Sequence, residues 1–151
     1  MSQVRRRQFL IAAGALLAAP FAANAQQRKI AKIGVLYTSN PAATTQFTEA
    51  FRQGIRGLGH SEGKTFVLEV RYGETRAERI SELARELVSL KVDVIVATTD
   101  QAIAAARQQT QTIPIVMVNS TDPVGTGFVA SLARPGGNVT GLSAMTPELS
   151  G

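Results

Sequence analysis

Three short polar segments of this sequence could hold a small ligand. Each follows an apolar run and offers hydroxyl, amide or carboxylate groups, which supply fixed hydrogen bonds to a small polar molecule. In the alternative interpretation, Asn40, Asp100 and Asp122 in or beside these segments only cap helices. The candidate ligand-binding residues are Thr38, Ser39, Thr98, Thr99, Asn119, Ser120 and Asp122.

The apolar runs that precede these segments are predicted strands. The run that begins at Ile113 is almost wholly apolar and β-branched, which is typical of a strand buried on both faces of a parallel sheet. Similar runs predict strands over 33–37, 66–72, 92–97 and 138–142, and the charged residues Glu69 and Arg71 favour an edge position for the second. Because ligands of open α/β sheets bind outside the carboxyl ends of the strands, we expect the three polar segments to meet there.

Helices are predicted between the strands. Their expected starts are Asn40-Pro41, a capping box over 75–78, Asp100 as an N-cap, and Asp122-Pro123. The last of these helices should carry Phe128, Val129 and Leu132. The alternation predicts an α/β fold, a flavodoxin- or Rossmann-like parallel sheet with helices on both faces and strand order 2-1-3-4-5.

Few residues of this chain are suited to catalysis. Cysteine is absent, and the one histidine, His60, lies in a predicted turn far in sequence from any nucleophile. Neither a dinucleotide fingerprint nor a Walker sequence is present, so no cofactor and no metal are expected. The alternative to a binding protein is a small exported hydrolase-like enzyme on the same fold, with Ser39 or Asp122 catalytic.

The first 25 residues have the three parts of a cleavable signal peptide. They comprise a basic start, an apolar run over 9–23 and the small-residue cleavage site Ala23-Asn24-Ala25. The run is shorter than the ~20 residues that span a bilayer, so we expect a periplasmic protein that spans no membrane after cleavage. The segment Arg6-Arg7-Gln8-Phe9-Leu10 resembles a twin-arginine export signal.

The net charge of +5 depends largely on this leader. Arg5, Arg6 and Arg7 lie within it, which leaves thirteen basic residues against eleven acidic ones in the rest of the chain. These charges are scattered, whereas a nucleic-acid-binding face needs clustered lysine and arginine. No nucleic-acid partner is predicted.

Several motifs resemble one family, the substrate-binding proteins of ABC transporters with a type I periplasmic-binding fold, in the group that includes tryptophan- and tyrosine-binding members. The most specific are Asp122-Pro123-Val124 and the run Arg134-Pro135-Gly136-Gly137-Asn138-Val139-Thr140-Gly141. The others are Ile33-Gly34-Val35-Leu36, Ala50-Phe51-Arg52-Gln53-Gly54 and Ile113-Pro114-Ile115-Val116.

The resemblance implies a two-lobed protein that clamps a small polar solute, with an amino acid as one candidate, and delivers it to an inner-membrane permease. By that analogy the seven candidate residues face the ligand from the first lobe. Residues 26–142 would form that lobe, and 143–151 would begin the crossover to a second lobe that this chain lacks.

Overall fold

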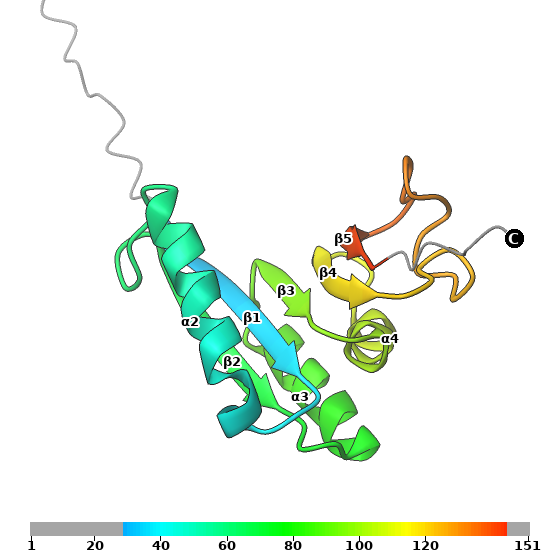
Figure 1. Ribbon diagram of the computed structural model, residues 1–151, viewed down its shortest axis with the longest axis horizontal. Coiled ribbons are helices and arrows are strands. Elements are labelled where there is room, and N and C mark those ends of the chain that lie inside the picture. The colour runs from blue at the N-terminus through cyan, green and yellow to red at the C-terminus, as the bar shows by residue number, and fades with distance from the viewer. Residues whose placement is uncertain (1–28, 145–151) are drawn as a thin grey trace, which may run out of the picture.

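The computed structural model describes residues 29–144, which form an α/β fold around one five-stranded parallel sheet (Figure 1). The strands lie in the order β2-β1-β3-β4-β5, and all four pairings are parallel. The expected fold class and strand order are therefore confirmed, as is the edge position of the second strand. The strands are β1 (Ala31–Tyr37), β2 (Phe66–Tyr72), β3 (Val94–Ala97), β4 (Ile115–Ser120) and β5 (Val139–Ser143).

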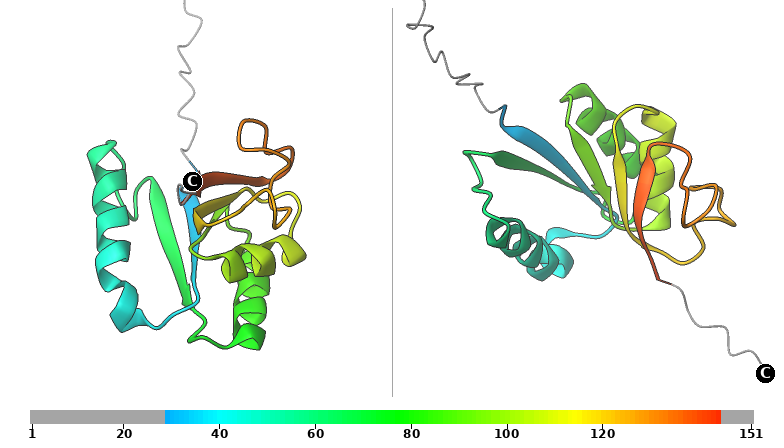
Figure 2. Two further views of the ribbon diagram at one scale, coloured as in Figure 1. Left: turned by 45° about the vertical axis from the view of Figure 1, so that its right-hand side comes forward. Right: turned by 90° about the horizontal axis from the view of Figure 1, so that it is seen from above.

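Helices cover the sheet unequally (Figure 2). Helix α2 (Pro41–Gly57) lies on one face, and α3 (Ala77–Ser89) and α4 (Asp100–Gln109) lie on the other. This division follows from right-handed crossovers. The chain moves toward the β2 edge of the sheet from β1 to β2, and toward the β5 edge from β2 to β3 and from β3 to β4, so the first helix lies on the opposite face from the next two.

Most of the core lies on the face covered by α3 and α4. Its largest fully buried side chains come from both layers and include Leu36, Ile80, Leu87, Ile95, Ile103 and Ile115. The core under α2 is smaller, with Val35, Tyr37 and Val96 buried and Phe51 packed against them. The α3–α4 face thus supplies most of the apolar burial that stabilises the fold.

Helix α2 only partly buries the apolar residues that recur along it and just beyond its end. Phe47 and Leu58 are 59% and 78% exposed, whereas Thr44 and Thr48 are buried. Both threonines are hydrogen-bonded: each hydroxyl donates to a backbone carbonyl four residues earlier, and the Thr48 hydroxyl also lies 3.0 Å from the Tyr37 hydroxyl. These bonds remove the usual cost of burying a hydroxyl group.

Two predicted helix starts are wrong in detail. The capping box over 75–78 does not form, because Thr75 has φ +64°, outside the extended region that an N-cap needs, and its hydroxyl donates to Glu74 O. Arg76 takes the N-cap position of α3 without a side-chain bond. Thr99, not Asp100, caps α4, and its hydroxyl oxygen accepts the Ala102 N–H at 3.3 Å.

No helix follows Asp122-Pro123, contrary to expectation. The Thr126 N–H donates to Asp122 O, which completes a single turn, and the chain then reverses at Gly127 with φ +71°. A left-handed residue at this point ends the helical path, so the segment from 121 to 138 consists of turns. The predicted leader over 1–25 lies outside the described residues, and none of the helices described within 29–144 is long and apolar enough to cross a bilayer.

Candidate functional site at the carboxyl edge

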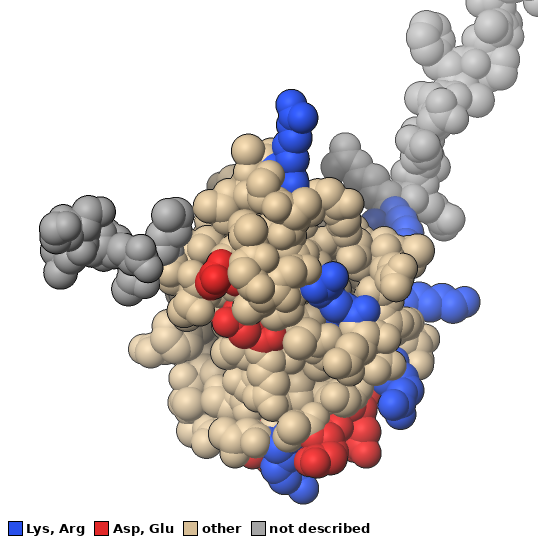
Figure 3. Space-filling view, turned by 90° about the vertical axis from the view of Figure 1, so that its right-hand side faces the viewer, with Lys and Arg blue, Asp and Glu red and all other residues tan. Residues whose placement is uncertain are grey.

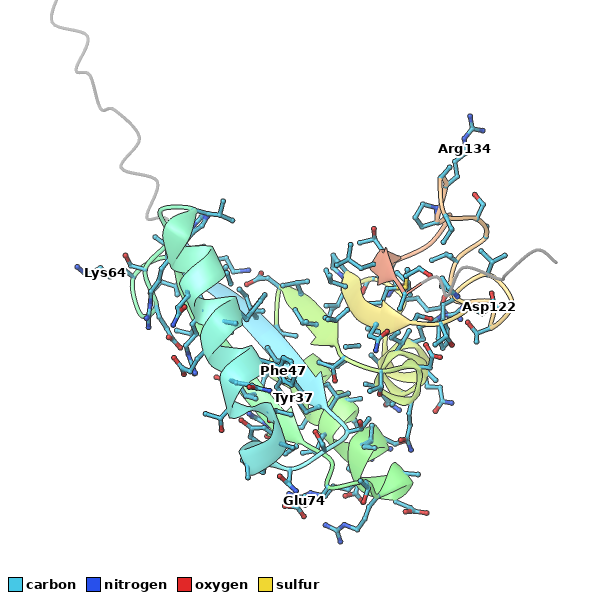
Figure 4. The ribbon with its side chains drawn as sticks, viewed as in Figure 1. Tyr37, Phe47, Lys64, Glu74, Asp122 and Arg134 are labelled. Atoms are coloured by element: carbon cyan, nitrogen blue, oxygen red, sulfur yellow. The ribbon has the colours of Figure 1, made fainter. Side chains whose placement is uncertain are left out.

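The carboxyl ends of β1, β3 and β4 lie side by side and open onto a cavity of about 440 Å³. The cavity lies between α2 and the sheet, where Figure 4 shows Tyr37 and Phe47. No charged residue lines it. Its lining residues are Val35, Tyr37, Thr38, Ser39, Ala43, Thr44, Phe47, Ala50, Phe51, Val96, Thr98, Thr99, Val118 and Asn119.

Five of the seven candidate residues line this cavity, namely Thr38, Ser39, Thr98, Thr99 and Asn119. They form what we call the polar rim, at the ends of three neighbouring strands. The remaining lining is apolar except for Thr44 and the Tyr37 hydroxyl, and it forms a trough below the rim, between α2 and the sheet. An apolar cavity with a few convergent polar groups is the usual form of a small-molecule site.

The rim residues divide into two kinds by their hydrogen bonds. The Thr98 hydroxyl donates to Leu36 O at 3.1 Å, and the Thr99 hydroxyl caps α4, so both have structural tasks. The side chains of Thr38, Ser39 and Asn119 make no hydrogen bond to the described part of the chain. These three are the rim groups that are free to bind a ligand.

Ser120 and Asp122, the other two candidates, do not line the cavity. Ser120 is fully buried, and its hydroxyl has no hydrogen-bond partner within residues 29–144. Asp122 lies on the loop after β4, away from Tyr37 and Phe47 (Figure 4). Its Oδ1 accepts the Gly125 N–H at 2.7 Å, so this carboxylate closes its own turn. The structure therefore does not bring either residue to the rim.

Strand β4 is irregular between Met117 and Ser120. The pairing of β4 with β5 shifts register between Met117 and Ser120. Val118 and Asn119 consequently both line the cavity, whereas strict alternation would place them on opposite faces. Bulges re-aim side chains in this way next to binding sites.

The β2–α3 loop is a part of the site that the sequence did not reveal. Its Gly73 N–H donates to Tyr37 O at 2.8 Å, and its Thr75 N–H donates to Thr38 O at 2.6 Å. Glu74 and Thr75 both have positive φ, at 52° and 64°, which is costly for residues other than glycine. The two bonds from Gly73 and Thr75 secure the main chain that leads to Ser39.

Asp100 also lies near the site, although the sequence predicted it only as a helix N-cap. It is the first residue of α4; its Oδ2 lies 3.5 Å from the Thr121 hydroxyl, and its Oδ1 is buried without a partner among the described residues. The carboxylate lies beside the rim but does not line the cavity. At a helix N-terminus a negative charge is stabilised by the backbone dipoles.

Residues 29–144 contain no cluster of side chains suited to a metal ion. No three His, Cys, Asp or Glu side chains in this range are grouped so as to hold a metal ion. His60 lies in the exposed turn after α2, at the end of that helix remote from Ser39. His60 therefore does not accompany Ser39, and the Asp122 carboxylate is bonded to its own turn.

The surface drawn in Figure 3 carries scattered lysine and arginine side chains with acidic ones among them. No basic stripe of the kind that tracks a phosphate backbone is visible on this face. This agrees with the scattered charges of the sequence.

Comparison with known proteins places this site in a family context. A tyrosine-binding protein of Clostridioides difficile (strain R20291) is 30% identical over 116 residues, which cover 77% of this chain and 34% of that protein. A conserved domain protein of Vibrio cholerae is 33% identical with a TM-score of 0.73, covering 79% of this chain and 40% of that one.

A third relative, a domain from Streptococcus pneumonia solved in complex with L-Trp, is 27% identical with a TM-score of 0.70. The match covers 76% of this chain and 39% of that one, so the chain spans between about a third and two fifths of the length of these relatives. The family model described as ABC transporter substrate binding protein matches residues 32–148. The chain belongs to the family of ABC transporter substrate-binding proteins.

Proposed function

We propose that this chain forms the first lobe of a two-lobed periplasmic protein that binds a small polar solute and delivers it to an ABC transporter permease. The observation that carries the proposal is the polar rim, in which free side chains from adjacent strand ends converge on an uncharged cavity. The proposed role is solute binding, in keeping with the family of substrate-binding proteins to which the chain belongs.

The solute should present hydrogen-bonding groups to the rim. The Asn119 amide both donates and accepts, and the Thr38 and Ser39 hydroxyls do the same, so a neutral or zwitterionic group suits them. One relative is named for tyrosine binding and another was solved with L-Trp, which supports an amino acid as the solute of this chain as well.

A titration of the chain with L-tyrosine and L-tryptophan, followed by amide chemical shifts, tests this function. NMR detects even millimolar binding, so a weak complex of one lobe remains visible. We expect shifts centred on 38–39, 98–99 and 119, and we expect Asn119→Ala to weaken binding about tenfold, since it removes roughly 1.4 kcal/mol of hydrogen bonding.

The matched control is Gln53→Ala, which removes a similar amide from the exposed side of α2 outside the cavity. It should leave the titration unchanged. Shifts centred elsewhere on the surface, or an equal effect of the two substitutions, would count against the rim as the binding site.

A further inference from the structure

Strand β2 forms an open edge of the sheet. It pairs with β1 on one side, and within residues 29–144 no strand lies on its other side (Figure 2). Just after the strand, the Gly73 N–H donates to Tyr37 O of β1. Because backbone groups alternate in direction along a strand, those of the odd-numbered residues of β2 face β1 and those of the even-numbered residues face outward. The outward-facing residues are Phe66, Leu68, Val70 and Tyr72.

Two arginine side chains cover outward carbonyl groups of this edge. Arg71 Nη1 donates to Val70 O at 3.0 Å, and Arg79 Nε of α3 donates to Tyr72 O at 3.3 Å. Charged side chains that lie over an open strand edge hinder its pairing with another strand. The two guanidinium groups therefore occupy acceptors that an added strand would need.

Ion pairs hold Arg71 in this position. Its Nη2 lies 2.8 Å from Glu86 Oε1 of α3, and its Nε donates to the same oxygen at 3.0 Å. On the other side, Glu69 Oε2 of the same strand lies 3.3 Å from Nη2. The Arg71 side chain is only 21% exposed, so its bond to Val70 O belongs to a fixed arrangement that joins β2 to α3.

The sequence of β2 is complementary to itself in the antiparallel orientation. With a two-fold axis at Val70, the Val70 residues of two copies face each other, and Leu68 of one copy faces Tyr72 of the other. These residues direct their backbone groups outward, so each pair can exchange both N–H···O bonds. Glu69 of one copy then lies opposite Arg71 of the other, and opposite charges at such a position stabilise the pairing. An axis at Glu69 would instead bring two carboxylates together, which is unfavourable.

We infer that the outer edge of β2 is a pairing surface for β2 of a second copy of this chain, and that Arg71 and Arg79 keep it closed. The two guanidinium groups occupy the Val70 and Tyr72 carbonyls, which are the acceptors for most of the hydrogen bonds of that pairing. Release of Arg71 from α3 frees the Val70 carbonyl and lets the arginine meet Glu69 of the second copy. The side chain that closes the edge in one copy thus supplies the charge pair between two.

The double variant Glu86→Gln/Arg79→Ala opens the edge while keeping Arg71. Sedimentation equilibrium should show that this opened variant self-associates more tightly than the unaltered chain, by about tenfold or more. The matched control is Glu82→Gln/Arg85→Ala, which makes the same two substitutions on exposed residues of α3. Association through any other surface is common to both variants. Equal association of the two double variants, or no increase in the opened one, would overturn the inference.

Amide hydrogen exchange followed by NMR locates the contact. In the opened variant the Leu68 and Val70 amides should exchange about tenfold more slowly at high protein concentration, because they gain acceptors in the second copy. The Val67 and Glu69 amides already face β1, so their exchange should not change and reports that the strand remains folded. Association without slower exchange at Leu68 and Val70 would assign the contact to another surface and overturn the inference.

A further substitution tests the register of the pairing. Glu69→Lys in the opened variant places a lysine opposite Arg71 of the second copy, so self-association should fall to the level of the control. Undiminished association would contradict pairing about Val70. Arg79→Ala alone leaves the Arg71–Glu86 ion pair intact and should give an intermediate association constant; no increase over the unaltered chain would count against the role of Arg79. No solute is present in these measurements, so their outcome is independent of the proposed solute site.

Discussion

In the proposed solute site, three side chains without a hydrogen-bond partner in the described residues would contact the ligand. Thr38, Ser39 and Asn119 face the cavity without a partner in the described residues, whereas the neighbouring Thr98 and Thr99 hold the strand ends and helix in place. The polar rim therefore contains two groups of residues, three proposed to bind the solute and two that stabilise the surrounding structure. Substitution of a supporting residue should therefore disturb stability, and substitution of a binding residue should disturb affinity.

The strain at Thr75 gives a prediction for stability. A β-branched residue at φ +64° is held there at a cost of about 1–2 kcal/mol, and glycine removes it at the expense of ~0.5–1 kcal/mol of chain entropy. Thr75→Gly should therefore raise the free energy of unfolding slightly, by up to ~1 kcal/mol in urea denaturation. Thr75→Ala keeps the Cβ atom and is the control; an equal gain from alanine would show that the backbone angle is not the cause.

Asp93 gives a prediction for pH dependence. The Lys29 ammonium and then the Lys32 backbone N–H hydrogen-bond its carboxylate and hold the pKa of Asp93 below its ordinary value. A lowered folded-state pKa means that the group stabilises the fold above its unfolded pKa, about 3.9, and that this contribution is lost as the pH falls through the lower folded pKa.

Asp93→Asn should thus reduce the free energy of unfolding at pH 7 and have less effect near pH 2. Denaturant titrations of both proteins at the two pH values measure the difference. Glu82→Gln is a suitable control, because it neutralises an exposed acid of α3. A loss of equal size at both pH values would indicate altered packing in place of lost charge.

At the level of elements, the strands could be read from the sequence and the details of the site could not. Short β-branched runs such as Ile113–Val116 identified the parallel strands, and the charges of β2 identified its edge position. Asn119 lines the cavity and Ser120 is buried, because adjacent side chains of a strand point to opposite faces of the sheet, so two neighbouring polar residues do not share one site. Periodicity along α2 marked its apolar residues but not which side the sheet would cover.

Pairing of β4 with β5 should depend on the absence of a side chain at Gly141. A Cβ atom there would lie 2.1 Å from Met117 O, and the residue has φ +134°. Gly141→Ala should cost at least ~2 kcal/mol of unfolding free energy, because backbone atoms cannot yield as a flexible side chain does. Gly137→Ala, which meets no atom within 4 Å, is the control in thermal denaturation. Equal small losses would mean that the β4–β5 contact is adjustable.

At the level of the molecule, the proposed first lobe would offer only part of a clamp. A cleft that closes from two sides surrounds the polar groups of its ligand, whereas a single lobe leaves one side hydrated. If contacts from a second lobe supply ~4 kcal/mol, their absence weakens binding about a thousandfold. The chain alone should therefore show little ligand-induced change in Tm. A fusion in which residue 144 continues into the remaining part of the Vibrio cholerae relative should show a clear one.

L-tyrosine and L-tryptophan at millimolar concentration are the ligands for this thermal-shift comparison. The fusion carrying Asn119→Ala should lose most of its shift, which ties the effect to this lobe. Tight one-to-one binding by the isolated chain in calorimetry would contradict the two-lobe proposal.

Export is also a property of the whole precursor. Replacement of Arg6 and Arg7 by lysine should leave the precursor in the cytoplasm if the twin-arginine route is used. Cell fractionation followed by immunoblotting measures this, with Arg5→Lys as the control. Unchanged periplasmic accumulation would indicate the general secretory route.

The chain enters the fold at the end opposite to the polar rim. Lys29 pairs with Asp93, and the Ala31 N–H donates to Thr65 O, both where strands begin, while the rim lies where strands finish. A seven-residue strand such as β1 separates the two ends by roughly 20 Å. A peptidase that removes the predicted leader upstream of Lys29 would thus act at one end of the strands, and a solute would bind near Asn119 at the other end. Neither event would obstruct the other, so cleavage could precede or follow solute binding.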